Sequence, residues 1–156
     1  MLKAKLVKYF ESLRYILAAI GFYLAYQPNN TSAEAIAYLV LWAVVPLAGL
    51  TGLESVFLSN ETAIAKGREA GSAYQIQSGL NNLATAITAF IIWYFQWGMK
   101  ASVTIIFVLY IFFILSSINH SIEYFRQENK KLIHLFRPMI TLILILVSLP
   151  IIMPGF

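Results

Sequence analysis

Four long apolar runs constrain this chain of 156 residues more than any other feature of its sequence. A bilayer core about 30 Å thick needs roughly 20 apolar residues of helix, and each run reaches that length. Their approximate ranges are Ala35–Leu58, Gln75–Trp97, Ala101–Phe125 and Leu132–Met153. Since 60% of all residues are hydrophobic and 12% are charged, the composition is that of an integral membrane protein. We predict an all-α, polytopic helix bundle that forms one domain over residues 1–156.

A fifth apolar run at the N-terminus is weaker than the other four. Its apolar core covers only Tyr15–Tyr26, so a full span over residues 6–27 has to include Lys8, Glu11 and Arg14. On a helix these three residues are spaced i, i+3 and i+6, where they can pair with one another and extend to the membrane interface. The alternative is four spans preceded by a helix that lies in the membrane plane. No small-residue cleavage site follows, so we expect the segment to stay in the mature protein.

The distribution of basic residues favours five spans. Lysines and arginines of short loops collect on the cytoplasmic side, and five spans leave only Lys100 on the opposite side. The cytoplasmic group is Lys3, Lys5, Lys8, Arg14, Lys66, Arg68, Arg126, Lys130, Lys131 and Arg137. Four spans would place basic loops outside. We therefore predict spans at about 6–27, 35–58, 75–97, 101–125 and 132–153, with the N-terminus inside and the C-terminus outside.

This topology places most of the polar residues within the spans in the cytoplasmic half. Ser78, Asn82 and Thr85 share one helix face, and so do Ser116, His120 and Glu123. Hydrocarbon offers polar groups no partner, so we expect the two faces to meet and to form a polar pocket. The candidate pocket residues are Glu54, Gln75, Asn81, Asn82, His120, Glu123 and Arg68, with Arg126 and Arg137 as further counter-ions.

Local features predict irregularities in and after the second run. Pro46 removes a helical hydrogen bond to the Trp42 carbonyl, so a kink is expected there. Ala48 and Gly52 are spaced four apart and allow a neighbouring helix to approach closely. The connection Ser59–Ser72 is expected to contain a short helix, because Ser59 suits its start and two glycines mark its end.

Three interpretations of the polar pocket remain open. A metal site would use His120, Glu123 and Glu54, but one His-x-x-Glu pair is a weak signal. A ligand or catalytic site would use His120 as a group that titrates near neutrality. The interpretation that we favour is structural, with the polar groups binding the helices together.

On this basis we expect no cofactor and no metal, and the chain contains no cysteine. Whether the protein is an enzyme stays open. The leading hypothesis is a non-enzymatic packing or assembly component, and the alternative is a protein that handles a small molecule or lipid. The expected partners are the lipid bilayer and either further copies of the chain or another membrane protein, and no nucleic acid, because the basic residues form no continuous face.

Residues from about 50 to 149 resemble a family of small bacterial multi-pass membrane proteins known only as a domain of unknown function. The residues that carry the resemblance are Val56-Phe57, Glu61, Lys66-Gly67, the run Gly71–Leu83, and His120. Three positions depart from the family pattern: Glu54 stands in place of His, Gln77 in place of Glu, and Ala73 in place of Pro. The resemblance implies a protein of the bacterial inner membrane, without a known reaction.

A weaker likeness connects the chain with the membrane-associated glutathione and eicosanoid enzymes, which have a similar length and four helices. Their Arg-x-x-x-Asn-x-x-Glu signature is not met around Arg68–Asn82. This likeness is the basis of the enzyme alternative.

Overall fold

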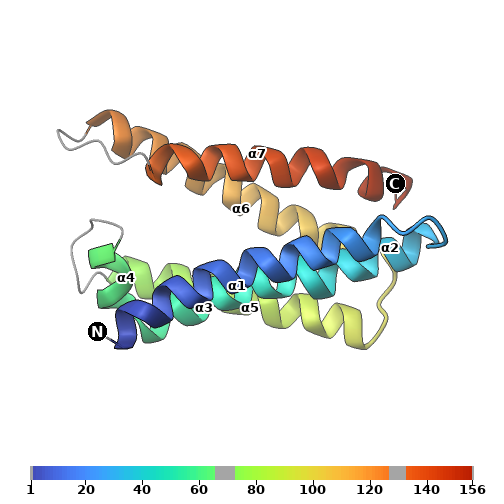
Figure 1. Cartoon of the computed structure of the whole chain (residues 1–156). Coiled ribbons are helices and arrows are strands. Elements are labelled where there is room, and N and C mark those ends of the chain that lie inside the picture. Colours follow the sequence, from blue (N-terminus) through green and yellow to red (C-terminus); the bar gives the residue numbers. More distant parts are fainter. Residues whose placement is uncertain (1, 66–72, 127–132, 156) are drawn as a thin grey trace.

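The computed structural model describes residues 2–65, 73–126 and 133–155, and these residues are helical almost throughout (Figure 1). The elements are α1 (Leu2–Ala25), α2 (Ser32–Leu39), the π-helix η1 (Val40–Val44), α3 (Val45–Phe57), α4 (Ser59–Ala65), α5 (Ala73–Tyr94), α6 (Met99–Arg126), α7 (Ile133–Ile152) and the 3-10 helix η2 (Met153–Gly155). No strand occurs in these three described ranges, which confirms the predicted all-α class.

Helices occupy all five ranges in which a membrane span is predicted. Two continuous helical segments are long and apolar enough to cross a membrane, Ser32–Phe57 with 26 residues and Met99–Arg126 with 28. At about 1.5 Å per residue, these segments are roughly 39 and 42 Å long. A shorter apolar helix covers Pro138–Ile152.

The helices form two groups that meet at one end of the molecule. α1, α3 and α5 lie side by side, whereas α6 and α7 form an antiparallel hairpin that packs on them through α2, η1 and α5 (Figure 1). The N-terminus, α4 and the end of α6 lie at one end, and the C-terminus and the start of α2 lie at the other.

The closest helix contact is between α3 and α5, at Gly52 and Gly79. A Cβ atom on Gly52 would lie 2.6 Å from Leu83 Cγ and 2.8 Å from the Gly79 carbonyl oxygen. Such distances are too short for any side chain, so only glycine permits this crossing. The predicted close approach at Gly52 is therefore present, and Ala48 is fully buried one turn before it.

A kink is predicted at Pro46, and the structure shows a π-helical turn, η1, directly before this region. The Val45 amide donates to the Val40 carbonyl, five residues earlier, and Pro46 lies in the first turn of the regular helix α3, where its missing amide hydrogen is tolerated. The short helix predicted after Ser59 is also present as α4; Gly67 and Gly71, expected at its end, lie outside the described residues.

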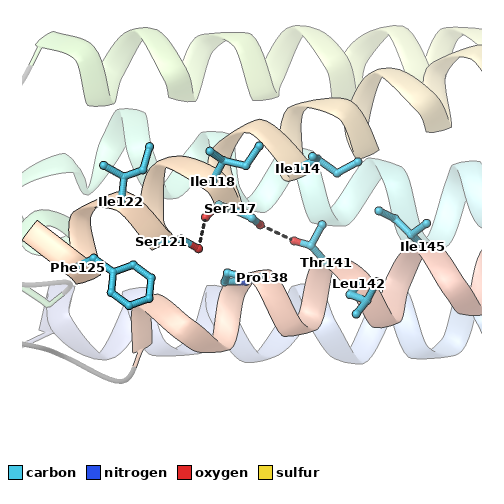
Figure 2. Close-up of a pocket in the computed structure, with 10 residues that line it drawn as sticks. All are labelled: Ile114, Ser117, Ile118, Ser121, Ile122, Phe125, Pro138, Thr141, Leu142 and Ile145. Atoms are coloured by element: carbon cyan, nitrogen blue, oxygen red, sulfur yellow. Dashed lines mark hydrogen bonds between the residues drawn. The ribbon is translucent and has the colours of Figure 1, made fainter.

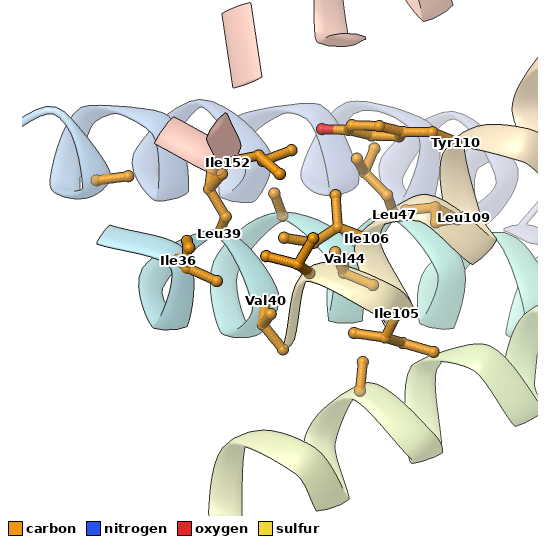
Figure 3. Close-up of a cluster of buried hydrophobic side chains, with 14 of the residues drawn as sticks. Ile36, Leu39, Val40, Val44, Leu47, Ile105, Ile106, Leu109, Tyr110 and Ile152 are labelled. Atoms are coloured by element: carbon orange, nitrogen blue, oxygen red, sulfur yellow. The ribbon is translucent and has the colours of Figure 1, made fainter. Parts of the chain in front are cut away.

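The main hydrophobic core lies where the hairpin meets the rest of the bundle (Figure 3). Ile36, Leu39, Val40 and Val44 from α2 and η1 pack against the first half of α6 and the end of α7. The partner side chains include Ile105, Ile106, Leu109, Tyr110 and Ile152. This core anchors one end of the hairpin, and the polar groups discussed next lie toward the other end.

Candidate functional site

A buried ion network joins the middle of α1 to the last turns of α3. Arg14 is only 4% exposed and Glu54 is completely buried. The Arg14 Nη1 atom lies 3.2 Å from Glu54 Oε2 and 2.9 Å from Thr51 Oγ1, while its Nη2 atom lies 3.0 Å from Glu11 Oε1. One guanidinium therefore donates to two carboxylates and one hydroxyl.

Helical spacing on both helices produces this arrangement. Glu11 and Arg14 are three residues apart on α1, as are Thr51 and Glu54 on α3, so each pair shares one face. The Thr51 hydroxyl donates to the Leu47 carbonyl at 2.6 Å, which leaves its lone pairs free to accept from Arg14. The ionic groups of α1 are thus held directly against α3.

The buried position of Arg14 corrects the prediction that this side chain extends to the membrane interface. Its predicted pairing with Glu11 is present, but the guanidinium turns inward to Glu54. A buried carboxylate without a counter-ion is costly, and pairing within the bundle offsets part of that cost. From the sequence, the counter-ion of Glu54 was expected among the arginines of the loops. The position of Arg14 inside an apolar run could have indicated that this arginine has a buried partner.

Two of the predicted pocket residues and one further counter-ion lie outside the part of the chain that the structure describes. Arg68 lies outside the described residues, and so do the side chains of Arg137 and Glu123. Arg126 is exposed at the end of α6, on the hairpin.

The polar side chains along one face of α5 form hydrogen bonds largely with the backbone of the same helix. Asn82 is buried and donates to the Ser78 carbonyl at 2.9 Å, and the buried Thr85 hydroxyl donates to the Asn81 carbonyl at 3.0 Å. Bonds of this kind need no partner helix. The Asn81 side chain is exposed, whereas Gln75 donates to the Ser59 carbonyl at 2.9 Å and so ties α5 to α4.

His120 is buried in the second half of α6. Among the described residues, no three His, Cys, Asp or Glu side chains are grouped so that they could hold a metal ion. Glu54, expected as a third ligand beside His120 and Glu123, is bonded to Arg14 of α1. That His120 shares one pocket with Glu54 and Asn82 stays a prediction.

A groove that sequence reasoning missed lies between α6 and α7, with a volume of about 450 Å³ (Figure 2). Its lining residues are Ile114, Ser117, Ile118, Ser121, Ile122 and Phe125 from α6, and Pro138, Thr141, Leu142 and Ile145 from α7. Nothing in the sequence distinguishes these isoleucines from apolar residues that face lipid.

The hydroxyl groups in this groove already have hydrogen-bond partners. Ser117 Oγ and Thr141 Oγ1 lie 3.0 Å apart and join the two helices, and the Ser121 hydroxyl donates to the Ser117 carbonyl at 2.9 Å (Figure 2). An occupant of the groove would therefore meet mainly hydrocarbon.

Comparison with known proteins gives one match. A family model described as "Family of unknown function (DUF6790)" matches residues 9–154. This confirms the expected relation to a family of unknown function and extends it beyond residues 50–149. No curated protein matches the chain, and no solved structure matches it.

Proposed function

We propose a function from the chain's own residues, because the chain belongs to the DUF6790 family and the function of that family is unknown. The protein is a non-enzymatic component of an assembly in the bacterial inner membrane. Its five long helices cross the membrane, with the N-terminus in the cytoplasm and the C-terminus outside. The observation that carries this proposal is the placement of side chains, with an ion network inside the bundle and large apolar groups on its surface.

Large apolar side chains cover the outer faces of α1, α5, α6 and α7. Exposed examples are Ile16 and Ile20 on α1, Ile87 and Phe90 on α5, Val108 and Ile111 on α6, and Ile143 and Leu146 on α7. Buried positions between the helices are instead often small or polar, including Ala18, Ala48, Ala89, Asn82 and Ser148. A soluble monomer seldom exposes apolar surface on this scale, whereas helices in lipid pack through small residues.

Helix lengths and charges are consistent with five crossings. α1, α5 and α7 contain 24, 22 and 20 residues, or roughly 36, 33 and 30 Å at about 1.5 Å per residue. Lys3, Lys5 and Arg126 lie toward the end that contains the N-terminus, and Lys100 follows the opposite end of α5. The exposed Tyr26, Tyr94 and Trp97 are also near that opposite end, as expected for residues of a membrane interface.

The polar side chains of the proposed cytoplasmic half act in packing. Arg14 and Glu54 lock α1 to α3, and Gln75 links α5 to the backbone of Ser59. Because these groups are engaged in bonds between helices, the outer, apolar faces are the surfaces through which the protein assembles with further copies of the chain or with another membrane protein.

Single cysteines test the topology, since the chain has none of its own. A cysteine in place of Lys100 is expected to react with a membrane-impermeant maleimide in intact cells. A cysteine in place of the exposed Asn60 on α4 is expected to react only after the cells are opened. Equal labelling at both sites in intact cells, or release of the protein from membranes by alkaline carbonate, would contradict five spans.

Assembly is tested by mass measurement of the protein purified in a mild detergent. The proposal predicts an oligomer or a co-purifying membrane protein in defined ratio. A stable, monodisperse monomer without a partner would overturn the assembly role and leave the topology intact.

A further inference from the structure

We propose that the groove between α6 and α7 binds an anionic phospholipid, with an acyl chain along the groove and the phosphate at Arg126. The inference rests on the proposed function, because it requires that the hairpin lies in the membrane. It assigns a ligand to a part of the molecule that plays no role in the buried ion network.

The chemistry of the groove favours a hydrocarbon chain. Ile114, Ile118 and Ile122 follow one another at one-turn intervals along α6, so the apolar wall runs parallel to the helix axis. The hydroxyls of Ser117 and Ser121 are already bonded, and Pro138 has no amide hydrogen. The volume of about 450 Å³ lies within the range of about 300–1,000 Å³ that is usual for ligand pockets. An extended, apolar ligand fits this shape without leaving a polar group unbonded.

Charge at one end of the groove favours an anionic head group. Phe125 lines the groove, and Arg126 is the next residue, in the last turn of α6. The Arg126 side chain is exposed, and none of the ion pairs among the described residues involves it. The sequence from residue 126 to residue 137 contains four basic residues and one acidic residue. Basic residues beside helices at the cytoplasmic face attract anionic lipid head groups.

A lipid suits this groove better than a partner helix. Where two helices of this protein touch most closely, glycines bring the backbones together, as at Gly52 and Gly79. The groove instead presents branched side chains and Phe125, which would keep another helix backbone at a distance. A flexible acyl chain can follow such a surface.

Two matched pairs of variants test the proposal. Ile118→Trp fills the groove, and Leu115→Trp adds the same bulk to an exposed position of α6 that does not line it. Arg126→Gln removes the proposed phosphate contact, and Lys100→Gln removes a basic residue at the opposite end. Each protein is purified in mild detergent, mixed with phosphatidylglycerol or phosphatidylcholine, and analysed for bound lipid by native mass spectrometry.

The original protein is expected to retain phosphatidylglycerol in preference to phosphatidylcholine. Ile118→Trp should lower the retention of both lipids at least about fivefold, while Leu115→Trp leaves it unchanged. Arg126→Gln should lower the preference for phosphatidylglycerol about fivefold, because one basic residue near a membrane surface strengthens the binding of anionic lipid by about that factor. Lys100→Gln should leave the preference unchanged.

Equal retention by the two tryptophan variants would overturn the proposal, as would an unchanged preference in Arg126→Gln. If Ile118→Trp does not fold, Arg126→Gln decides alone, because its side chain is exposed at a helix end. Cross-linking of Ile118→Cys into a dimer in membranes would also overturn the proposal, since a second copy would then cover the groove. Extraction of the original protein by alkaline carbonate would instead refute the membrane topology on which the inference rests.

Discussion

The α3–α5 contact and the α6–α7 contact join neighbouring long helices in different ways. The first uses glycines that let the backbones touch, and α1 reinforces α3 through the Arg14–Glu54 pair. The second is bridged by the hydroxyls of Ser117 and Thr141 and by a hydrogen bond from the Tyr110 hydroxyl to the Leu144 carbonyl, and branched side chains line the groove beside it. Small residues leave no space between helices, whereas bulky residues hold them apart. The comparison indicates that α3 and α5 pack without a gap, whereas a groove remains between α6 and α7.

The largest effect is expected from breaking the ion network. Glu54→Gln leaves the Arg14 charge buried with weaker compensation and should lower the free energy of unfolding by about 3–5 kcal/mol. Glu11→Gln removes the more exposed carboxylate of the same network and should cost less than about 1 kcal/mol. Unfolding in mixed micelles by denaturant titration measures both. Equal losses in the two variants would show that burial does not distinguish the carboxylates.

A smaller loss is expected when the glycine contact is widened. In Gly52→Ala the added methyl group collides with Leu83 and with the Gly79 backbone, so α3 and α5 must separate at a cost of about 1–3 kcal/mol. Gly49→Ala is the matched control on the same helix, because its Cβ atom would lie 3.4 Å from Ala86 Cβ, an ordinary contact. Thermal denaturation of the two variants in one detergent provides the comparison. An equal tolerance of both changes would refute the close crossing.

The hairpin should respond more weakly than the glycine contact. A double-mutant cycle with Ser117→Ala and Thr141→Val is expected to give a coupling energy of about 0.6 kcal/mol, typical of hydrogen bonds between helices in membranes. Ser121→Ala is the control, since this hydroxyl bonds only to the backbone of its own helix. A coupling energy of about 2 kcal/mol or more would contradict this, because the hydroxyl pair would then exceed the strength usual for hydrogen bonds between membrane helices.

The smallest effect is expected at the exposed pair that links α1 to α4, where Lys3 Nζ lies 3.3 Å from Glu61 Oε1. A hydrogen bond from its own backbone lowers the pKa of Glu61, burial opposes this, and Lys3 lowers the pKa further. The contribution to stability is therefore present above the ordinary pKa of a glutamate and is lost as the pH falls through the lowered value.

Salt and pH test this smallest effect. Lys3→Gln should lower the melting temperature slightly at neutral pH and low salt, and the difference should vanish in high salt or in acid. Lys5→Gln, at an exposed position two residues away, is the control. A salt-independent loss in Lys3→Gln would indicate a packing role for this side chain.

Sequence patterns were sufficient for the local features of this molecule. Apolar runs located the helices, because helix formation depends on neighbouring residues. Gly52 indicated where another helix can approach, but its partners Gly79 and Leu83 on α5 were not predicted. The predicted kink at Pro46 did not foresee the π-helical turn η1. The partner of Glu54 was not found in this way, since Arg14 is forty residues distant and the choice among several arginines depends on how α1 rotates about its axis. The α5 stripe was also only partly predicted, because Asn82 bonds within its own helix.

The sequence by itself determined an all-helical chain whose apolar runs are long enough to cross a membrane, because helix length and hydropathy are properties of contiguous residues. Only the tertiary structure decided which helices touch, that Arg14 turns inward to Glu54, and that a groove remains between α6 and α7. These features depend on the rotation, tilt and separation of whole helices, which the combined packing of many distant side chains sets.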